Sequence, residues 1–380
     1  MTAQSLRVAD DGCVADERHM RRALALARRG LGRVEPNPMV GCVLVRNGRV
    51  VGEGYHRRFG RAHAEVEALH DAGRAARGAT VYVTLEPCAH TGKTPPCTDA
   101  LIRAGVAHVV AAVKDPNPLV AGKGVRALQR AGIRVDVGLL ESDVRELNAP
   151  YLKRVETGRP YVILKWAQSL DGRIATPRGG SPTISGPEAL RWVHRLRARV
   201  DGIIVGIGTV LADDPQLTAR DVPIRRVATR IVLDSNLRTP PGSRLVRSAG
   251  QTPVVLLATE GAMRRHAKRA ARLTSASVEI VTCRPRARRI DLTDALDKLG
   301  RRGMTNLLIE GGAEVIAGFL AGRLVDEAVV FISPMVVGAA TASVRLPADA
   351  FSAAAVDTCR MGCDAAFLYR FPAATRAGRD

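Results

Sequence analysis

The chain has 380 residues, of which 46% are hydrophobic and 25% charged, a composition typical of a globular protein with more than one domain. It contains no apolar run of membrane-spanning length, and segment 1–16 lacks the apolar core of a secretory signal. Its seven cysteines, an odd number, are scattered along a chain long enough to bury a core without disulfides. We therefore expect a protein of the reducing cytoplasm, whose cysteines pack or bind metal.

The charge is strongly positive. The formal net charge is +20, and 50 of the 57 basic residues are arginine. Such a surface suits nucleic acid, membrane phosphates or anionic small molecules. However, the basic residues are dispersed, and aromatic residues make up only 3% of the chain, too few to stack nucleic acid bases. We expect a small anionic molecule as the partner, and neither nucleic acid nor a membrane.

Helical and extended patterns alternate through the first half of the chain. Asp16 is placed to cap a helix that runs to Arg29, and Asn47-Gly48 is a turn between two strands, at 40–45 and 49–54. Further elements are expected as helices at 64–72, 97–104 and 125–131 and as strands at 80–85, 108–113 and 134–137. Helices interleaved with strands predict a sheet sandwiched between helices.

A charged segment with turn formers, 139–158, precedes a second alternating half. Strands are expected there at 161–166, 202–206, 230–233, 253–258, 278–281, 305–309, 327–332 and 367–371. Helices are expected at 187–199, 263–274, 292–301 and 314–321. The sequence therefore predicts two α/β domains, at 15–147 and 159–372.

One histidine and two cysteines of the first half form a candidate metal site. His63 opens a predicted helix, Cys88 follows a strand and Cys97 opens the next helix. One imidazole and two thiolates suit zinc, and a catalytic zinc keeps its fourth position for water. Glu65 lies two residues from His63, so on a helix its carboxylate splays away from the imidazole. It is better placed to move a proton than to bind the metal.

The pattern His63-x-Glu65, followed by Pro87-Cys88 and a second cysteine, resembles the zinc deaminases, which replace a ring amino group by a carbonyl and release ammonia. The usual form has two residues between its cysteines, whereas eight, 89–96, separate them here. Two alternatives stay open. The chain could be a nucleic-acid deaminase whose basic segment 158–380 binds RNA. It could also hold structural zinc, with Cys42 or His90 as fourth ligand.

Over about residues 16–371 the chain resembles the bifunctional riboflavin-biosynthesis deaminase–reductases. The eight-residue spacer between the cysteines is this family's own form. The other matching motifs are Pro36-Asn37-Pro38-x-Val40-Gly41, Asp115-Pro116-Asn117-Pro118, Gly122-Lys123-Gly124, Ser169-Leu170-Asp171-Gly172, Thr209-Val210-Leu211-Ala212-Asp213-Asp214-Pro215, Asp234-Ser235 and Glu310-Gly311-Gly312.

The resemblance implies a cytidine-deaminase-like three-layer α/β/α domain followed by a dihydrofolate-reductase-like α/β domain. The first would use Zn²⁺ to deaminate 2,5-diamino-6-ribosylamino-4(3H)-pyrimidinone 5′-phosphate, and the second would use NADPH to reduce the ribosyl chain of the product to ribityl. His63, Cys88 and Cys97 would be the zinc ligands, Glu65 the proton donor and Asn37 a substrate contact. We expect the enzyme to form a homo-oligomer.

The resemblance also implies binding residues in the second half. Substrate contacts fall on Ser181, Arg197, Leu217, Arg220 and Glu310. Cofactor contacts fall on Ala167, Thr183, Thr209, Asp213, Ser235 and the loop Gly312, Ala313, Glu314, Val315, Ile316, Ala317 and Gly318. Glu310-Gly311-Gly312 leaves an apolar strand and opens a helix, where free N–H groups and glycines suit a pyrophosphate. Arg197 and Arg220 suit forked hydrogen bonding of the substrate phosphate. Asp171 is equally compatible with a simple turn after a strand.

Overall fold

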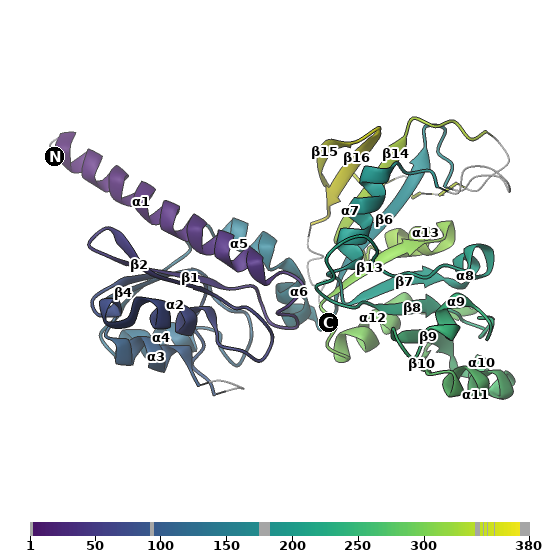
Figure 1. Cartoon of the computed structure of the whole chain (residues 1–380), viewed down its shortest axis with the longest axis horizontal. Coiled ribbons are helices and arrows are strands. Elements are labelled where there is room, and N and C mark those ends of the chain that lie inside the picture. The colour runs from purple at the N-terminus through teal and green to yellow at the C-terminus, as the bar shows by residue number, and fades with distance from the viewer. Residues whose placement is uncertain are drawn as a thin grey trace. The chain divides into compact units, whose positions relative to one another are not determined.

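The computed structural model describes residues 3–91, 95–174, 183–338, 343–344, 346–347, 349–352 and 354–372, with side chains from residue 14 onward. The chain divides into two compact units, Met1–Thr157 and Gly158–Asp380, and each mixes helices with a sheet (Figure 1). Among the described residues, no helix combines the length and hydropathy that spanning a bilayer requires.

The first unit contains a five-stranded sheet in the order β2-β1-β3-β4-β5. β1 is antiparallel to β2 and β3, whereas β3, β4 and β5 are parallel. The strands are β1 (Gly41–Arg46), β2 (Arg49–Tyr55), β3 (Thr80–Leu85), β4 (His108–Val113) and β5 (Arg134–Val137). The helices are α1 (Ala3–Ala27), α2 (Ala64–Ala72), α3 (Cys97–Ala104), α4 (Lys123–Arg130), α5 (Glu141–Leu147) and α6 (Ala149–Thr157), with short 3-10 turns η1 (Arg28–Gly30) and η2 (Gly73–Ala76).

Helices cover both faces of this sheet, as the alternating pattern predicts (Figure 1). One core contains Ala64 and Ala68 of α2 and Leu101 of α3. The other contains Met20 of α1 and Tyr151 of α6. The result is the three-layer α/β/α arrangement expected from the sequence.

Two local predictions in the first unit have different outcomes. The β1–β2 turn is as expected, because Asn47 and Gly48 have φ of 51° and 71°, which a two-residue hairpin turn of this type requires. The helix start expected at Asp16 is wrong, because α1 already begins at Ala3. The Asp16 carboxylate accepts a hydrogen bond from the Tyr82 hydroxyl and so ties the helix to β3.

Segment 139–158, expected as a charged boundary with turn formers, forms α5 and α6. Both helices are rich in charged residues, so the sequence does not reveal their few apolar positions. Of these, Val144, Tyr151 and Leu152 are buried against the sheet.

The second unit contains a nine-stranded sheet in the order β10-β9-β8-β7-β13-β6-β14-β16-β15. Seven strands are parallel, and β16 and β15 are antiparallel additions at one edge. The strands are β6 (Tyr161–Ser169), β7 (Gly202–Gly206), β8 (Thr229–Leu233), β9 (Val254–Thr259), β10 (Val278–Cys283), β13 (Asn306–Gly311), β14 (Glu327–Ser333), β15 (Ala355–Met361) and β16 (Asp364–Arg370). A separate hairpin joins β11 (Pro285–Arg286) to β12 (Arg289–Ile290).

The helices of the second unit are α7 (Pro187–Arg197), α8 (Ile207–Asp213), α9 (Arg244–Arg247), α10 (Glu260–Arg265), α11 (Ala267–Ser275), α12 (Leu292–Arg301) and α13 (Ala313–Ala321). Every residue of β7 is buried, as expected for a parallel strand with both faces covered. The single helix expected at 263–274 is instead α10 and α11, separated at His266. The sequence does not predict β15, because this strand lies exposed at the edge of the sheet and has no apolar run.

Candidate functional site

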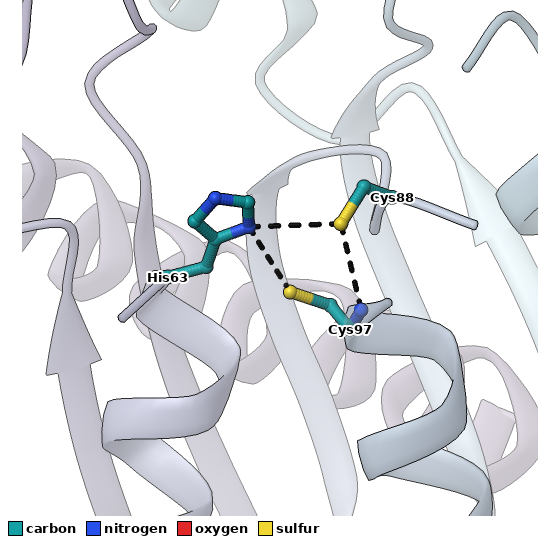
Figure 2. Close-up of side chains that lie close together, drawn as sticks. All are labelled: His63, Cys88 and Cys97. Atoms are coloured by element: carbon teal, nitrogen blue, oxygen red, sulfur yellow. Dashed lines mark hydrogen bonds between the residues drawn. The ribbon is translucent and has the colours of Figure 1, made fainter. Parts of the chain in front are cut away.

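The three candidate metal ligands lie where elements of the first unit begin or end (Figure 2). His63 is the residue immediately before α2, Cys97 is the first residue of α3, and Cys88 lies in the loop after β3. Because β3 is followed by this loop and then by α3, the two cysteines meet although eight residues separate them. The three side chains point toward one another.

The geometry fits a metal ion. His63 Nδ1 lies 3.2 Å from Cys97 Sγ and 3.6 Å from Cys88 Sγ, and all three ligand atoms lie within 4.8 Å of one another. The Cys97 backbone N–H donates to Cys88 Sγ at 3.4 Å. Hydrogen bonds with Cys97 and His63 lower the pKa of Cys88 to about 4, which favours the thiolate that binds metal. The hydrogen bond with Cys88 raises the pKa of Cys97. One nitrogen and two sulfurs are a donor set that suits zinc.

A fourth protein ligand is not found within the described part of the chain, where the cluster of potential ligands consists of His63, Cys88 and Cys97 alone. Cys42 is buried inside β1, and His90 lines the neighbouring cavity, but neither belongs to the cluster. The structural-zinc alternative therefore lacks the extra ligand it needs. Three protein ligands are instead the number used by catalytic zinc.

Glu65 is a buried acid beside this cluster. It lies in the first turn of α2 and is only 3% exposed. Burial raises the pKa of its carboxyl to about 7, although His63 acts in the opposite direction. A carboxyl that exchanges its proton near neutral pH is suited to general acid–base chemistry.

A cavity of about 310 Å³ opens beside these residues and lies wholly within the first unit. His63, Glu65 and Cys88 line it, together with Asn37, the predicted substrate contact. Asn37 Nδ2 lies 3.3 Å from Nε2 of His56, whose Nδ1 bonds the Ala62 carbonyl at 3.0 Å.

His56, which the sequence analysis leaves unassigned, is therefore part of the site. Its ring packs edge-on against His63, with 5.4 Å between ring centres. The motif gives no sign of this, because β1 and β2 separate His56 from the Pro36-Asn37-Pro38 segment and only the fold brings the two together.

Glu86 also lines the cavity. Its buried carboxylate accepts backbone N–H groups from Asp115 at 3.3 Å, Gly122 at 2.9 Å and Val125 at 3.1 Å. The side chain directly before Pro87-Cys88 thus joins this motif to the motifs at 115–118 and 122–124. The joint holds the zinc-ligand loop against the start of α4.

In the second unit, two segments expected to bind cofactor lie against each other, Thr209 in α8 and the junction of β13 with α13. Gly312 precedes α13 with φ of 72°, and a Cβ on Gly311 or Gly312 would lie 3.3 Å from Thr209 Oγ1 in α8. Because the two glycines have no side chain, their backbone lies directly beside a hydroxyl and a helix start. These residues fit a cofactor phosphate, which needs close backbone approach.

Arg197 and Glu310, both predicted substrate contacts, form a nearly buried bidentate pair. Arg197 Nε lies 2.6 Å from Glu310 Oε1, Nη2 bonds Oε2, and Nη1 donates to the Thr218 carbonyl at 3.2 Å. The guanidinium N–H groups of Arg197, which are expected to bind phosphate, therefore donate to the Glu310 carboxylate in this structure. Lys165, unassigned in the sequence analysis, belongs to the same charged group. Burial and Arg197 lower the pKa of Lys165, while Glu310 raises it.

The other predicted positions are more scattered. Arg220 donates its backbone N–H to His194 Nδ1 at 3.2 Å, Leu217 is buried, and Ala167 lies on β6. The Ser235 hydroxyl accepts the Ile290 N–H at 3.1 Å, Asp213 ends α8, and Thr183 is exposed. Ser181, and residues 92–94 of the spacer between the two cysteines, lie outside the described residues.

Asp171 has a structural role. Its carboxylate accepts the Ser169 hydroxyl at 2.6 Å and the N–H groups of Val337 at 3.1 Å and Gly338 at 2.7 Å. These hydrogen bonds lower its pKa to about 2. Asp171 therefore joins the segment after β6 to the segment after β14, and the turn interpretation is the better one.

Comparisons with known proteins agree with this arrangement. Residues 14–113 match the family model described as the cytidine and deoxycytidylate deaminase zinc-binding region, and residues 160–366 match the RibD C-terminal domain. The Escherichia coli riboflavin biosynthesis protein RibD is 44% identical over 85% of this chain and 89% of its own length. RibD of Aquifex aeolicus is 42% identical over 85% of this chain and 88% of its own length.

Solved structures give the same result. RibD of Acinetobacter baumannii superposes with a TM-score of 0.81 at 36% identity, covering 94% of this chain and 99% of its own. A Thermotoga maritima diaminohydroxyphosphoribosylaminopyrimidine deaminase/5-amino-6-(5-phosphoribosylamino)uracil reductase superposes with a TM-score of 0.82 at 34% identity, covering 95% of this chain and 100% of its own.

The fold and the site define a two-activity α/β enzyme, with a zinc-dependent deaminase domain followed by an NADPH-dependent reductase domain. Because residues 160–366 match the RibD C-terminal domain, the basic second half is a reductase domain, and the RNA-binding alternative is not supported. The chain belongs to the RibD family of riboflavin biosynthesis enzymes.

Proposed function

We propose that the first domain deaminates 2,5-diamino-6-ribosylamino-4(3H)-pyrimidinone 5′-phosphate and that the second reduces the ribosyl chain of the product to ribityl. The observation that carries the first step is the cluster of His63, Cys88 and Cys97 beside the buried Glu65 at a cavity of the first unit. The name of the Thermotoga maritima relative, which joins both activities, supports the pairing.

His63, Cys88 and Cys97 would hold the zinc ion. Bound zinc with an open position makes water a nucleophile near neutral pH. Glu65 would take one proton from the attacking water and give it to the ring nitrogen, and would then take the second proton of the same oxygen and give it to the amine. The amine would leave as ammonia while the ring carbon keeps the oxygen as a carbonyl. Asn37, oriented by His56, would bind the edge of the pyrimidine.

For the reductase we propose the cofactor and substrate positions named from the sequence, with Lys165 added. NADPH supplies a hydride when bound. Thr209 and the backbone at Gly311-Gly312 would receive its phosphates. Glu310 and Arg197, each held rigid by the other, would orient the ribosyl chain, with Lys165 as a neighbouring cation. Domain limits of 15–147 and 159–372, a cytoplasmic location and a homo-oligomeric state stay predictions.

The test is Glu65→Gln, which keeps the shape of the side chain but removes its acid. We expect normal zinc content, loss of at least about 100-fold in ammonia release and unchanged NADPH oxidation on the deaminated intermediate. The matched control is Glu67→Gln on the same helix, a partly exposed residue that pairs with Arg57. Wild-type ammonia release by the Glu65 variant would contradict the role given to Glu65.

A further inference from the structure

The zinc ligands, Glu65 and the Asn37–His56 pair account for only part of the cavity wall. Besides the exposed Arg61, two further basic side chains line the same cavity, Arg154 from α6 and His90 from the loop after Cys88. Neither belongs to the metal cluster, and neither is used in the deamination step described above.

Each of these two side chains has one buried polar atom that makes no hydrogen bond within the described residues. Arg154 Nε and His90 Nδ1 are shielded from solvent, and neither bonds to any atom of the described residues. Such groups are rare in folded proteins because burial removes their water without replacing it. A ligand that supplies an acceptor would account for both atoms, since both line one cavity.

The neighbouring carboxylates are already engaged. Asp115 accepts the Tyr151 hydroxyl at 2.9 Å and the Asn117 N–H at 2.9 Å, and Glu86 is occupied by three backbone N–H groups. Neither carboxylate forms an ion pair with Arg154, and the Nε of Arg154 makes no hydrogen bond within the described residues, so the positive charge of Arg154 has neither acid as its partner. Its complement has to be an anion that enters with the ligand.

We propose that Arg154, assisted by His90, binds the phosphate of the pyrimidine ribotide and makes the deaminase selective for the phosphorylated substrate. The inference rests on the proposed function, which supplies a ligand with an aminopyrimidine ring and a phosphate at opposite ends. The ring belongs beside zinc, Glu65 and Asn37, and the planar guanidinium matches a phosphate through paired hydrogen bonds. Arg61 also lines the cavity, but it is exposed, so solvent and salt screen its charge.

The experiment measures ammonia release by the full-length zinc enzyme from the ribotide and from its dephosphorylated nucleoside. In the wild type we expect a KM for the ribotide at least about tenfold below that for the nucleoside. Arg154→Gln should raise the ribotide KM about 10- to 100-fold, leave the nucleoside KM unchanged and change kcat little. Arg154→Lys should restore part of the selectivity. Inorganic phosphate should inhibit the wild type competitively and the Gln variant much less.

The matched control is Arg103→Gln, an exposed arginine on α3 that does not line the cavity, and it should leave all these constants unchanged. Equal KM values for ribotide and nucleoside in the wild type would overturn the inference while leaving deamination intact. So would an Arg154→Lys variant that binds zinc, reduces the deaminated intermediate and shows no greater selectivity than Arg154→Gln. If the wild type released no ammonia from either compound, the proposed function would fall, and this inference with it.

Discussion

The contact between α4 and the zinc-ligand loop leaves no room for a side chain at Gly124. Gly124, in the first turn of α4, packs so closely on Pro87 that a Cβ would lie 1.9 Å from the Pro87 carbonyl oxygen and 3.2 Å from Glu86 Cγ. Pro87 directly precedes the zinc ligand Cys88. Gly124→Ala therefore forces α4 and the ligand loop apart by about 1 Å, since real Cβ contacts below 3.0 Å essentially do not occur.

Two opposing effects determine the sign of the stability change. Replacing glycine by alanine inside a helix normally stabilises by about 0.8–1 kcal/mol. Overpacking a rigid contact costs about 1–3 kcal/mol and sometimes more, and here both sides of the contact are backbone, which cannot rotate away. The shift also strains the three hydrogen bonds of Glu86 to the start of α4. The cost is larger, so we expect net destabilisation of about 1–2 kcal/mol.

The assay combines thermal unfolding with zinc content after dialysis against a chelator. Gly124→Ala should lower the midpoint of the first unit by about 2–8 °C, accelerate zinc loss and reduce ammonia release, while NADPH oxidation on the deaminated intermediate stays normal. Gly250→Ala is the control, because nothing lies within 4 Å of a Cβ at that exposed position. A Gly124→Ala enzyme that is more stable than the wild type and retains zinc would refute this reasoning.

Two further predictions concern buried basic groups. Arg230→Met should cost the second unit about 1–3 kcal/mol in urea unfolding, because the half-buried acceptors of Ser248 and Thr252 lose the donors of the fully buried Arg230 side chain. An unchanged midpoint would contradict this. Burial lowers the pKa of His19, so protonation favours the unfolded state and the first unit should lose stability as the pH falls below about 6.5. His19→Gln should flatten that part of the melting-temperature profile, and a variant with the same slope as the wild type would exclude His19 as its source.

Much of the first unit follows from the sequence because its signals are local. The hairpin at Asn47-Gly48 and the helix at Ala64–Ala72 come from turn chemistry and periodicity, which need no tertiary information. The metal cluster is also readable, since one histidine and two cysteines at element ends leave few alternatives. Local signals do not predict the start of α1. Asp16, its predicted N-cap, lies within the helix and accepts a hydrogen bond from Tyr82 of β3.

What sequence could not provide is the set of partners that a side chain meets across the fold. His56 joins the site through Asn37 and His63, and Arg154 becomes notable only because its Nε is buried beside a cavity. Arg197 was expected to hold a phosphate, yet Glu310 occupies its fork from 113 residues away. Each of these contacts links separate elements, so no local pattern encodes it.

The most direct test of the account is to remove the metal and follow both activities in one sample. After chelation, the enzyme should lose its single equivalent of zinc and with it ammonia release, while reduction of the deaminated intermediate by NADPH continues. Added Zn²⁺ should restore deamination in the wild type but not in Cys97→Ser, which lacks one sulfur of the cluster. Full deamination by metal-free enzyme, or by Cys97→Ser without zinc, would contradict the central claim.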